Sequence, residues 1–255
     1  MTRTRRATET GLTLAAPVTL LLVWEILSRT GVIDPLFWPA PSTLGDTAWE
    51  LLRDGTLLGN VGTSLGRILV GFVLGAVPAV LFGLLMGLFW PIRAFLMPIA
   101  TVIYAIPKIS IVPLVFVVFG FGETSMYVVV AISIFFLVLL NTVSGVLQID
   151  RTYRDVARNF GAGPLGLFLT VALPGALPAI FTGLRLGLGF ALVVIVGTEF
   201  ITAGGGIGRY IYDSWQIYAI DKMFVGLIAT GLLGWLLTLA LNLLERVVLP
   251  WRPAS

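Results

Sequence analysis

The densest cluster of charged side chains in the second half of the chain lies at residues 150–161, Asp-Arg-Thr-Tyr-Arg-Asp-Val-Ala-Arg-Asn-Phe-Gly, between two long apolar segments. Thr152 can cap a short helix, with Asp155 three positions on as in a capping box, and Gly161 stands where a helix of about two turns would end. The pattern therefore predicts a short polar helix. Such a helix can dock onto a soluble partner, although charge alone is more typical of an ordinary positive cytoplasmic loop.

The same stretch also loosely imitates a phosphate-binding loop, through Gly161, Gly163 and Gly166. These glycines follow no strand pattern, and Pro164 removes one of the backbone amides that such a loop would use. The chain also contains no G-x-x-x-x-G-K-[ST] motif and no Gly-Lys pair. The sequence therefore predicts that any ATP is handled by another polypeptide.

Other chemistry is limited by composition, since the chain contains no cysteine and no histidine. Disulfides, thiol redox reactions, Cys/His metal sites and histidine acid–base catalysis are thereby removed. No nucleophile with a neighbouring base stands out either. An enzyme is therefore poorly supported.

The composition indicates a polytopic membrane protein. Of the 255 residues, 58% are hydrophobic and 11% are charged, and the mean hydropathy is +1.01. One soluble core cannot bury that much apolar surface. A net charge of +3 and a pI near 9.5 are compatible with nucleic-acid binding, but the basic residues stand at the borders of apolar segments. A lipid bilayer, and no nucleic acid, is therefore the expected partner of these charges.

Long apolar segments predict the membrane-spanning helices, because about 20 helical residues cross a hydrocarbon core. The first follows a basic amino-terminal segment, residues 1–10, and no small-residue cleavage site follows it, so it is expected to be an uncleaved span. In the fifth, Pro178 is well placed as the first helical residue. The six predicted spans cover about residues 11–29, 68–90, 94–119, 126–147, 178–201 and 224–244.

Two spans carry a further signal. Gly71, Gly75, Gly83 and Gly87 recur every four or eight residues in the second span, and small residues at that spacing allow another helix to pack closely. The third span contains three prolines, each expected to kink it; these are Pro98, Pro107 and Pro113.

Residues 30–60 are rich in turn formers and are predicted to form an outer loop. From Ser42 the apolar residues Leu44, Ala48, Leu51 and Leu52 fall on one helical face, up to Gly55. The pattern predicts a short amphipathic helix that either lies on the outer membrane surface or caps the helical bundle.

Basic residues indicate the orientation. The predicted inner segments hold nine arginines, and the predicted outer segments hold five basic residues, among them Arg67. This bias predicts that both termini, and residues 150–161 with them, lie in the cytoplasm.

Charged residues inside a span are functional candidates by default. At about 1.5 Å per residue, Lys108 lies roughly 21 Å into the third span and Glu199 roughly 31 Å along the fifth, so both are expected in the outer half. They are predicted to pair. The pair would be a gate or a wall of a translocation path, or else a structural ion pair that fixes helix packing. Arg185, nearer the inner end of its helix, is expected to snorkel to the cytoplasmic interface.

The spacing around residue 155 carries a family resemblance. From Asp155 the order is Asp-Val-Ala, three residues, Gly161, nine residues, Val171, one residue, and Leu173-Pro174. It resembles the E-A-A-x-x-x-G-(x)9-I-x-L-P loop of membrane subunits of bacterial ABC importers, with every interval kept. Asp replaces Glu, Val replaces Ala and Val replaces Ile, which preserves charge or apolarity. In that family the loop presents a coupling helix to a groove on the ATPase subunit.

Further segments resemble the nitrate/sulfonate/taurine/bicarbonate branch of these permeases. They are Pro39-Ala40-Pro41-Ser42, Arg53-Asp54-Gly55, Ser64-Leu65-Gly66-Arg67, residues 106–114, Phe119-Gly120-Phe121-Gly122, and Thr182-Gly183-Leu184-Arg185 with Glu199. The resemblance implies an all-α type I ABC importer permease fold of about six transmembrane helices, with a cytoplasmic coupling helix. The expected division is a cytoplasmic segment 1–10, a first span 11–29, an outer loop 30–60, a core 61–246 containing the coupling loop 150–174, and a tail 247–255.

The resemblance also implies site residues. The residues expected to dock the ATPase are Arg154, Asp155, Val156, Ala157, Phe160, Gly161, Val171, Leu173 and Pro174. Those expected at the translocation path or gate are Pro107, Lys108, Ser110, Pro113 and Glu199.

The implied function is that of a multi-pass permease subunit of a bacterial inner membrane, which binds no cofactor itself. ATP and magnesium would bind to two partner ATPase subunits, an external binding protein would deliver the substrate, and a second copy of the chain would complete a homodimer. The expected substrate is a small anion such as a sulfonate, taurine, nitrate or bicarbonate. A pyrimidine vitamin precursor or an aromatic acid is the alternative, and a stand-alone secondary transporter is a further one.

Overall fold

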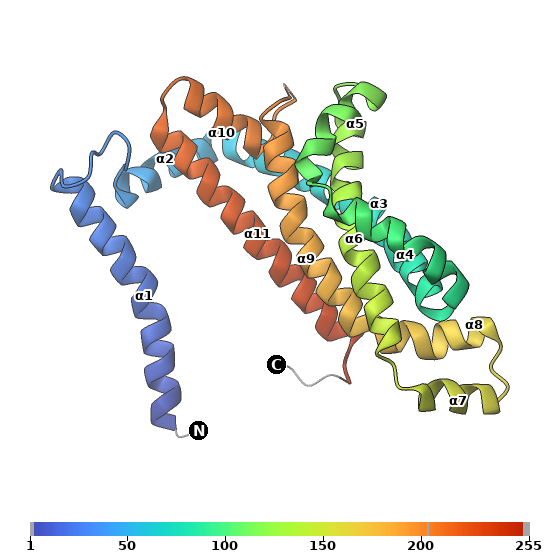
Figure 1. Cartoon of the computed structure of the whole chain (residues 1–255). Coiled ribbons are helices and arrows are strands. Elements are labelled where there is room, and N and C mark those ends of the chain that lie inside the picture. Colours follow the sequence, from blue (N-terminus) through green and yellow to red (C-terminus); the bar gives the residue numbers. More distant parts are fainter. Residues whose placement is uncertain (1–2, 203, 252–255) are drawn as a thin grey trace.

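A computed structural model describes residues 3–202 and 204–251, with side chains from Ala15 onward, and helices are the only regular secondary structure in that part of the chain (Figure 1). Within it, four helical segments are long and apolar enough to cross a membrane. They are α3 (Thr56–Leu88), α6 (Glu123–Leu147), the continuous path Pro164–Glu199, and α11 (Ile220–Val248). The bent pair Trp90–Ala105 and Lys108–Phe119 would make a fifth crossing.

The predicted first span falls within α1 (Arg3–Arg29). Side chains of its first residues, 11–14, lie outside the described part, so the assignment of 11–29 as a span stays a prediction. In Figure 1 the start of α1, the end of α11 and the short helix α7 (Arg151–Asn159) all lie at the lower end of the molecule. This is the arrangement expected of a chain whose two ends and middle loop share one side.

Helices α3 and α6 pack at very short distance through the predicted glycine stripe. A Cβ atom on Gly71 would lie 2.6 Å from the Cβ of Val130, and one on Gly75 would lie 2.5 Å from the carbonyl oxygen of Ala131. Gly83 and Gly87 meet Thr142 and Val146 in the same way. The prediction of close packing is therefore confirmed, with α6 as the partner helix.

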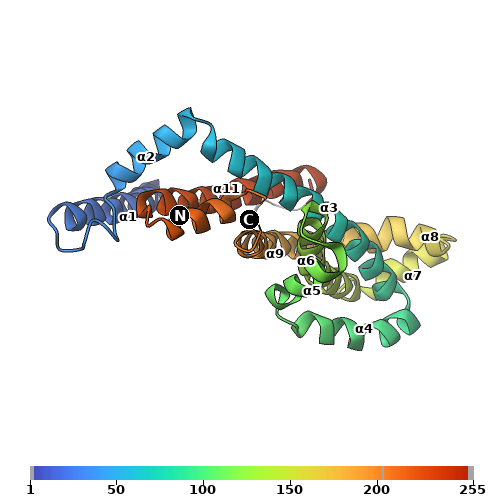
Figure 2. The ribbon, with the colours of Figure 1, turned by 90° about the horizontal axis from the view of Figure 1, so that it is seen from above.

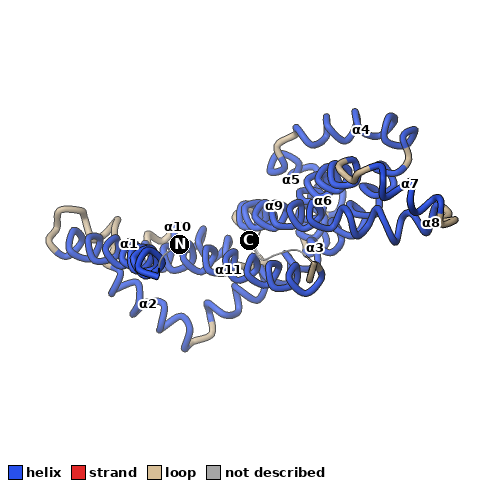
Figure 3. Tube along the Cα trace, turned by 90° about the horizontal axis from the view of Figure 1, so that it is seen from below, coloured by secondary structure: helices blue, strands red, loops and turns tan. Residues whose placement is uncertain are grey.

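Helix α9 (Leu173–Glu199) packs on the other side of α6, so α3, α6 and α9 lie side by side when the molecule is seen from above (Figure 2). The main hydrophobic core lies between them and includes Ile68, Val130, Ile134, Ala191 and Ile195. In Figure 3 the helices α1 and α2 extend away from this group, and both α3 and α11 run between the two parts of the molecule.

Only one of the three prolines in the third span breaks it. Helix α4 (Trp90–Ala105) continues through Pro98, and Pro113 stands in the first turn of α5 (Val112–Phe119), where no intrahelical donor is needed. The break is at Ile106 and Pro107, before the 3-10 segment η1 (Lys108–Ile111), and the two halves are bent by 92°.

The fifth span begins earlier than predicted. Pro178 lies inside α9, and helical structure continues back through η2 (Phe168–Ala172), a π-helical turn, to α8 (Pro164–Leu167). Pro174, and not Pro178, occupies the first turn of α9. A proline is compatible with a first turn, so the sequence alone offered both positions. Burial of Ala176 and Ile180 against α6 favours the longer helix.

Helix α2 (Pro41–Arg53) caps the bundle at the end opposite α7 (Figure 1). Leu44 and Leu51 are buried as predicted, whereas Leu52 is 40% exposed. Leu51 packs in a cluster with residues of α3 and α11, and Thr47 donates to Asp221 at 3.0 Å. Of the two alternatives, capping of the bundle is therefore the one found. The short α10 (Ile207–Gln216) joins α9 to α11 at the same end.

The glycine stripe gives a stability prediction. Gly75→Ala is expected to destabilise the purified protein by about 1–3 kcal/mol, because the added methyl group meets backbone atoms of Ala131 that cannot move independently of α6. The measurement is the thermal unfolding midpoint in one detergent. Gly62→Ala, on the same helix with nothing within 4 Å, is the matched control and should leave the midpoint unchanged or slightly raised. Equal midpoints for both variants would show that the stripe is not a packing surface.

Candidate functional site

The short helix α7 is held at its start by a side-chain cap. Asp150 is the N-cap residue, and its carboxylate accepts from the backbone N–H of Thr152 at 2.8 Å and from the Thr152 hydroxyl at 2.7 Å. The predicted capping box of Thr152 with Asp155 is therefore wrong, because the capping position lies two residues earlier. The same N–H donation holds the pKa of the Asp150 carboxyl below its usual range. The cap is consequently in place at neutral pH and is lost only as the pH falls through that lowered pKa.

The end of α7 is set by Gly161, as predicted. Its φ is +80°, its N–H donates to the carbonyl of Arg158, and the N–H of Ala162 reaches back to Ala157. A Cβ atom here would meet nothing within 4 Å, so the requirement for glycine comes from the left-handed backbone and not from crowding. Gly163 returns the chain to an extended conformation before α8 begins.

One face of α7 is turned toward the bundle. The guanidinium of Arg154 donates to the carbonyl oxygen of Val146 at 2.5 Å, in the last turn of α6, where the same carbonyl also accepts from the backbone N–H of Ile149 at 3.3 Å. Ala157 on the same face is half-buried. Arg154 was expected on sequence grounds to dock a partner. It instead donates a hydrogen bond within its own chain and links α7 to α6.

The opposite face of α7 is open. Tyr153, Val156 and Phe160 are exposed large side chains, and Phe160 is 89% exposed. A groove of about 720 Å³ is lined by Tyr153, Val156 and Ala157 of α7, and its far wall includes Thr170, Pro174 and other residues of the following helical segment. Asp155 is exposed, while Val171, Leu173 and Pro174 are half-buried. The predicted loop residues thus gather around one amphipathic helix with an adjoining groove.

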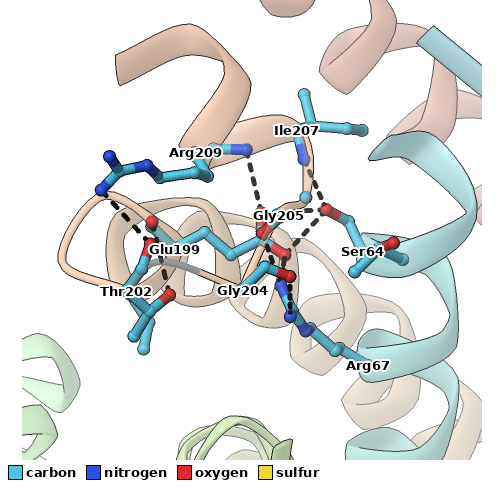
Figure 4. A network of polar contacts seen from close by, with 12 residues as sticks. Ser64, Arg67, Glu199, Thr202, Gly204, Gly205, Ile207 and Arg209 are labelled. Atoms are coloured by element: carbon cyan, nitrogen blue, oxygen red, sulfur yellow. Dashed lines mark hydrogen bonds and ion pairs between the residues drawn. The ribbon is translucent and has the colours of Figure 1, made fainter. Parts of the chain in front are cut away.

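A second cluster lies at the other end of the bundle, around a fully buried ion pair (Figure 4). Arg67 is 2% exposed and Glu199 is completely buried, and their charged groups are 2.8 Å apart. The Ser64 hydroxyl lies 2.8 and 2.9 Å from the two oxygens of Glu199, and the backbone N–H of Gly208 donates to the carboxylate at 2.9 Å. Every polar atom of this carboxylate therefore has a partner, as burial of a charge requires.

Arg67 extends the network to two further elements. It donates to the carbonyls of Gly204 and Gly205, both at 2.8 Å, and to the half-exposed carboxylate of Glu123 at 2.9 Å. The guanidinium thereby connects α3, α6, α9 and the loop before α10. Arg67 was predicted to lie in a segment outside the second span, but it is a buried residue within α3. The available signal was its position near the start of a long apolar run, only four residues before the first glycine of the stripe.

Lys108 does not pair with Glu199, so that prediction is wrong. Its ammonium group donates to the carbonyls of Ile103, Tyr104 and Ile106 at 2.8 to 2.9 Å and lies 5.6 Å from the ring centres of Tyr104 and Phe136. The ammonium group thus compensates carbonyls at the end of α4, where the break at Pro107 interrupts the regular helical hydrogen bonds; among the three, the Ile103 carbonyl also accepts from the backbone N–H of Ile106. Lys108 caps the end of α4, while Pro107, Ser110 and Pro113 are exposed around the bend.

Arg185 also has a partner that the sequence did not indicate. It forms an ion pair with Glu245 at 2.5 Å and a hydrogen bond to Asn242 at 3.1 Å, which link α9 to α11. In the part of the chain that the structure describes, no group of three or more acidic side chains is placed to hold a metal ion. The arrangement is therefore one of helix-linking polar contacts and an open docking face.

The buried pair gives a prediction on stability. Arg67→Gln is expected to cost about 3 kcal/mol or more, because it leaves the buried Glu199 charge uncompensated. The double variant Arg67→Gln with Glu199→Gln removes both charges and should recover part of the loss. Arg209→Gln, which breaks the more exposed pair with Asp213, should cost about 0–1 kcal/mol. Unfolding midpoints of the four proteins test this, and an Arg67→Gln variant as stable as the Arg209→Gln variant would contradict it.

Comparisons with known proteins agree with this architecture. Residues 79–252 match the family described as binding-protein-dependent transport system inner membrane component. A putative aliphatic sulfonates transport permease protein, SsuC, of Bacillus subtilis is 33% identical, covering 94% of this chain and 87% of its own length. The taurine transport system permease protein TauC of Escherichia coli is 31% identical over 91% of this chain and 86% of its own. The nitrate import permease protein NrtB of Synechocystis is 32% identical with the same coverage.

Solved structures show the same fold. A chain of the MetNI methionine ABC transporter in an inward-facing conformation superposes with a TM-score of 0.66 at 21% identity, covering 75% of this chain and 95% of that one. At that identity the likeness concerns the fold alone. Together, the family match over two thirds of the chain and the identity above 30% along nearly all of it show that this protein belongs to the binding-protein-dependent transport system inner membrane components, the permease subunits of ABC importers.

Proposed function

We propose that this permease subunit imports a small anion, with a sulfonate, taurine, nitrate or bicarbonate as the substrate class. The observation that carries this proposal is the identity of about a third, along nearly the whole chain, to permeases named for aliphatic sulfonates, taurine and nitrate. An importer for a pyrimidine vitamin precursor or an aromatic acid is the alternative. A secondary transporter that works alone is disfavoured by the family membership.

The ATPase docks on the open face of α7 in this proposal. The exposed Asp155, Val156 and Phe160 are its contacts, and the adjoining groove, with Pro174 in its wall, receives a projecting part of the ATPase surface. The exposed contact residues are supported on the inner side by Ala157, Gly161, Val171 and Leu173. Arg154 acts differently from the sequence-based expectation, since it fixes α7 to α6. The support is exposed apolar area on a polar helix that no other described part of the chain covers.

Movement of α7 is passed to the spanning helices through two connections. Arg154 links it to the end of α6, and the continuous helical path from Pro164 links it to α9. ATP and magnesium bind to two ATPase subunits, one on each of two copies of this chain. Because ATP favours the closed pair of ATPases, it shifts the permease toward the conformation that fits that closed pair.

The substrate path lies between the two copies and includes the bend at residues 107–113. Pro107, Ser110 and Pro113 are exposed there, and Lys108 sets the bend by capping α4. Glu199 acts from behind this region by joining α9 to α3. An external binding protein delivers the substrate to the end that carries α2 and α10. Both termini and α7 are cytoplasmic in the inner membrane, which agrees with the excess of arginine in those segments.

The division of the chain follows from the same proposal. Residues 1–10 are a cytoplasmic start, 11–29 the first span, 30–60 the outer loop with α2, 61–246 the transport core with the coupling loop 150–174, and 247–255 the tail. The family match over residues 79–252 falls almost entirely within the proposed core and tail.

The docking role is tested at Gly161. Gly161→Val is expected to abolish substrate uptake and ATPase co-purification while the protein stays in the membrane, because valine strongly disfavours a φ of +80° and the end of α7 must rearrange. Gly163→Val is the matched control. Gly163 has a φ of −71° with nothing within 4 Å, so its variant should keep both activities. Normal uptake by the Gly161→Val variant would count against the coupling role.

The substrate class is tested by reconstitution. The permease, its ATPase and its binding protein are placed in liposomes, and uptake of labelled taurine, nitrate and bicarbonate is measured with and without ATP. At least one of these anions should accumulate only with ATP. An excess of unlabelled anion of the same class should lower that uptake. Uptake of a neutral pyrimidine or an aromatic acid, with no competition by any of the three anions, would reject the proposal in favour of the alternative.

A further inference from the structure

A second cavity lies on the other side of α7, between α7, α8 and the junction of α3 with α4. Its volume is about 320 Å³. We call it the basic pocket, and its lining residues are Leu88, Phe89, Arg154, Arg158, Ala162, Pro164, Leu167 and Val171. It is distinct from the 720 Å³ groove on the open face, with which it shares only Val171.

Two arginines and no carboxylate line the basic pocket. Arg154 and Arg158 are one helical turn apart, so their charges repel each other along α7. Among the described residues neither forms an ion pair, and the Nε of Arg154 is buried without any hydrogen-bond partner, while its Nη2 donates to Val146. A buried guanidinium donor without an acceptor, beside a second cation, is unfavourable unless an anion compensates it.

The remaining walls of the basic pocket are apolar, and they lie at the edge of the membrane. Leu88 is the last residue of the spanning helix α3, and Phe89 links it to α4. Pro164 and Leu167 face the same cavity from the start of the next span. A ligand here meets positive charge on one side and hydrocarbon on the other, which a fully hydrated ion does not match.

We propose that the basic pocket binds the phosphate group of an anionic phospholipid from the cytoplasmic leaflet, with an acyl chain along Leu88 and Leu167. Basic pockets between spanning helices on the cytoplasmic side are suited to such headgroups, and arginine binds phosphate through paired N–H donors. The bound phosphate reduces the repulsion between the two arginines. It also holds α7 in the orientation, relative to the spanning helices, in which the ATPase docks. This inference rests on the proposed cytoplasmic position of α7, and it adds a dependence of ATPase docking on lipid charge.

The test measures lipid binding by the full-length chain alone. Protein is reconstituted in phosphatidylcholine vesicles with one phosphatidylglycerol in three, extracted in mild detergent, and analysed by native mass spectrometry for retained phosphatidylglycerol. Arg158→Gln should lower the retained fraction about tenfold, since a charged hydrogen-bonded pair to phosphate is lost. Arg151→Gln, which removes the same charge from an exposed position outside the pocket, is the matched control and should retain the lipid. Equal loss in both variants would show general surface attraction and overturn the proposal.

A second variant covers the case in which Arg158→Gln alters α7 itself. Ala162→Glu places a carboxylate in the pocket beside the arginines, so it should exclude the lipid while α7 remains helical by hydrogen exchange. Inorganic phosphate added to pure phosphatidylcholine vesicles tests a soluble ligand. If phosphate stabilises the protein as much as phosphatidylglycerol does, the pocket takes a soluble anion and the lipid proposal is wrong. None of these measurements involves transport, so their failure is separable from a failure of the Gly161→Val test.

Discussion

The close contact of α3 with α6 is the constraint on which the other arrangements depend. Four glycines bring the two backbones together, and this contact fixes how far one helix is shifted along the other. At one end the shift brings Arg67 to Glu123, the first residue of α6. At the other end it sets where Val146, and with it the Arg154 of α7, must lie. A change in this packing would therefore alter both the buried ion pair and the position of α7.

Polar groups in this apolar chain are placed where regular helical hydrogen bonds end. Lys108 donates to carbonyls at the break in the third span, and Arg67 donates to those of Gly204 and Gly205. Arg154 does the same for the last turn of α6. Hydrocarbon offers no water to such carbonyls, so a cation from the chain takes its place. Lys108, which was predicted to line a transport path, and Arg154, which was predicted to dock the ATPase, thus each stabilise the end of a helix.

The short helix α7 connects this frame to its surroundings. Its inward face is bound to α6 through Arg154. After the turn at residues 160–163, the helical path from Pro164 runs without a break into α9. Its open face is the one proposed to dock the ATPase, and the basic pocket beside it is the one proposed to bind an anion. Because α6 and α9 both reach the Arg67–Glu199 cluster, a displacement of α7 and the conformation of the opposite end of the bundle are mechanically related. That relation is what an ATP-driven importer needs.

Patterns local in the sequence were sufficient for the class of fold, the helix ended by Gly161, the glycine contact face and the family spacing from Asp155 to Pro174. Each depends on residues a few positions apart on one element, where periodicity, backbone conformation and hydropathy act directly. The cap at Asp150 and the start of the fifth span were missed because neighbouring residues of similar type compete for one position, and small packing differences decide between them. The partners of Arg67, Lys108, Glu199 and Arg185 were decided only by the tertiary structure. For Arg67, Glu199 and Arg185, which partner is near depends on how far each helix is shifted and rotated against residues more than fifty positions away. Lys108 instead donates to carbonyls only two to five positions before it, so its partners depend on where the chain breaks at Pro107.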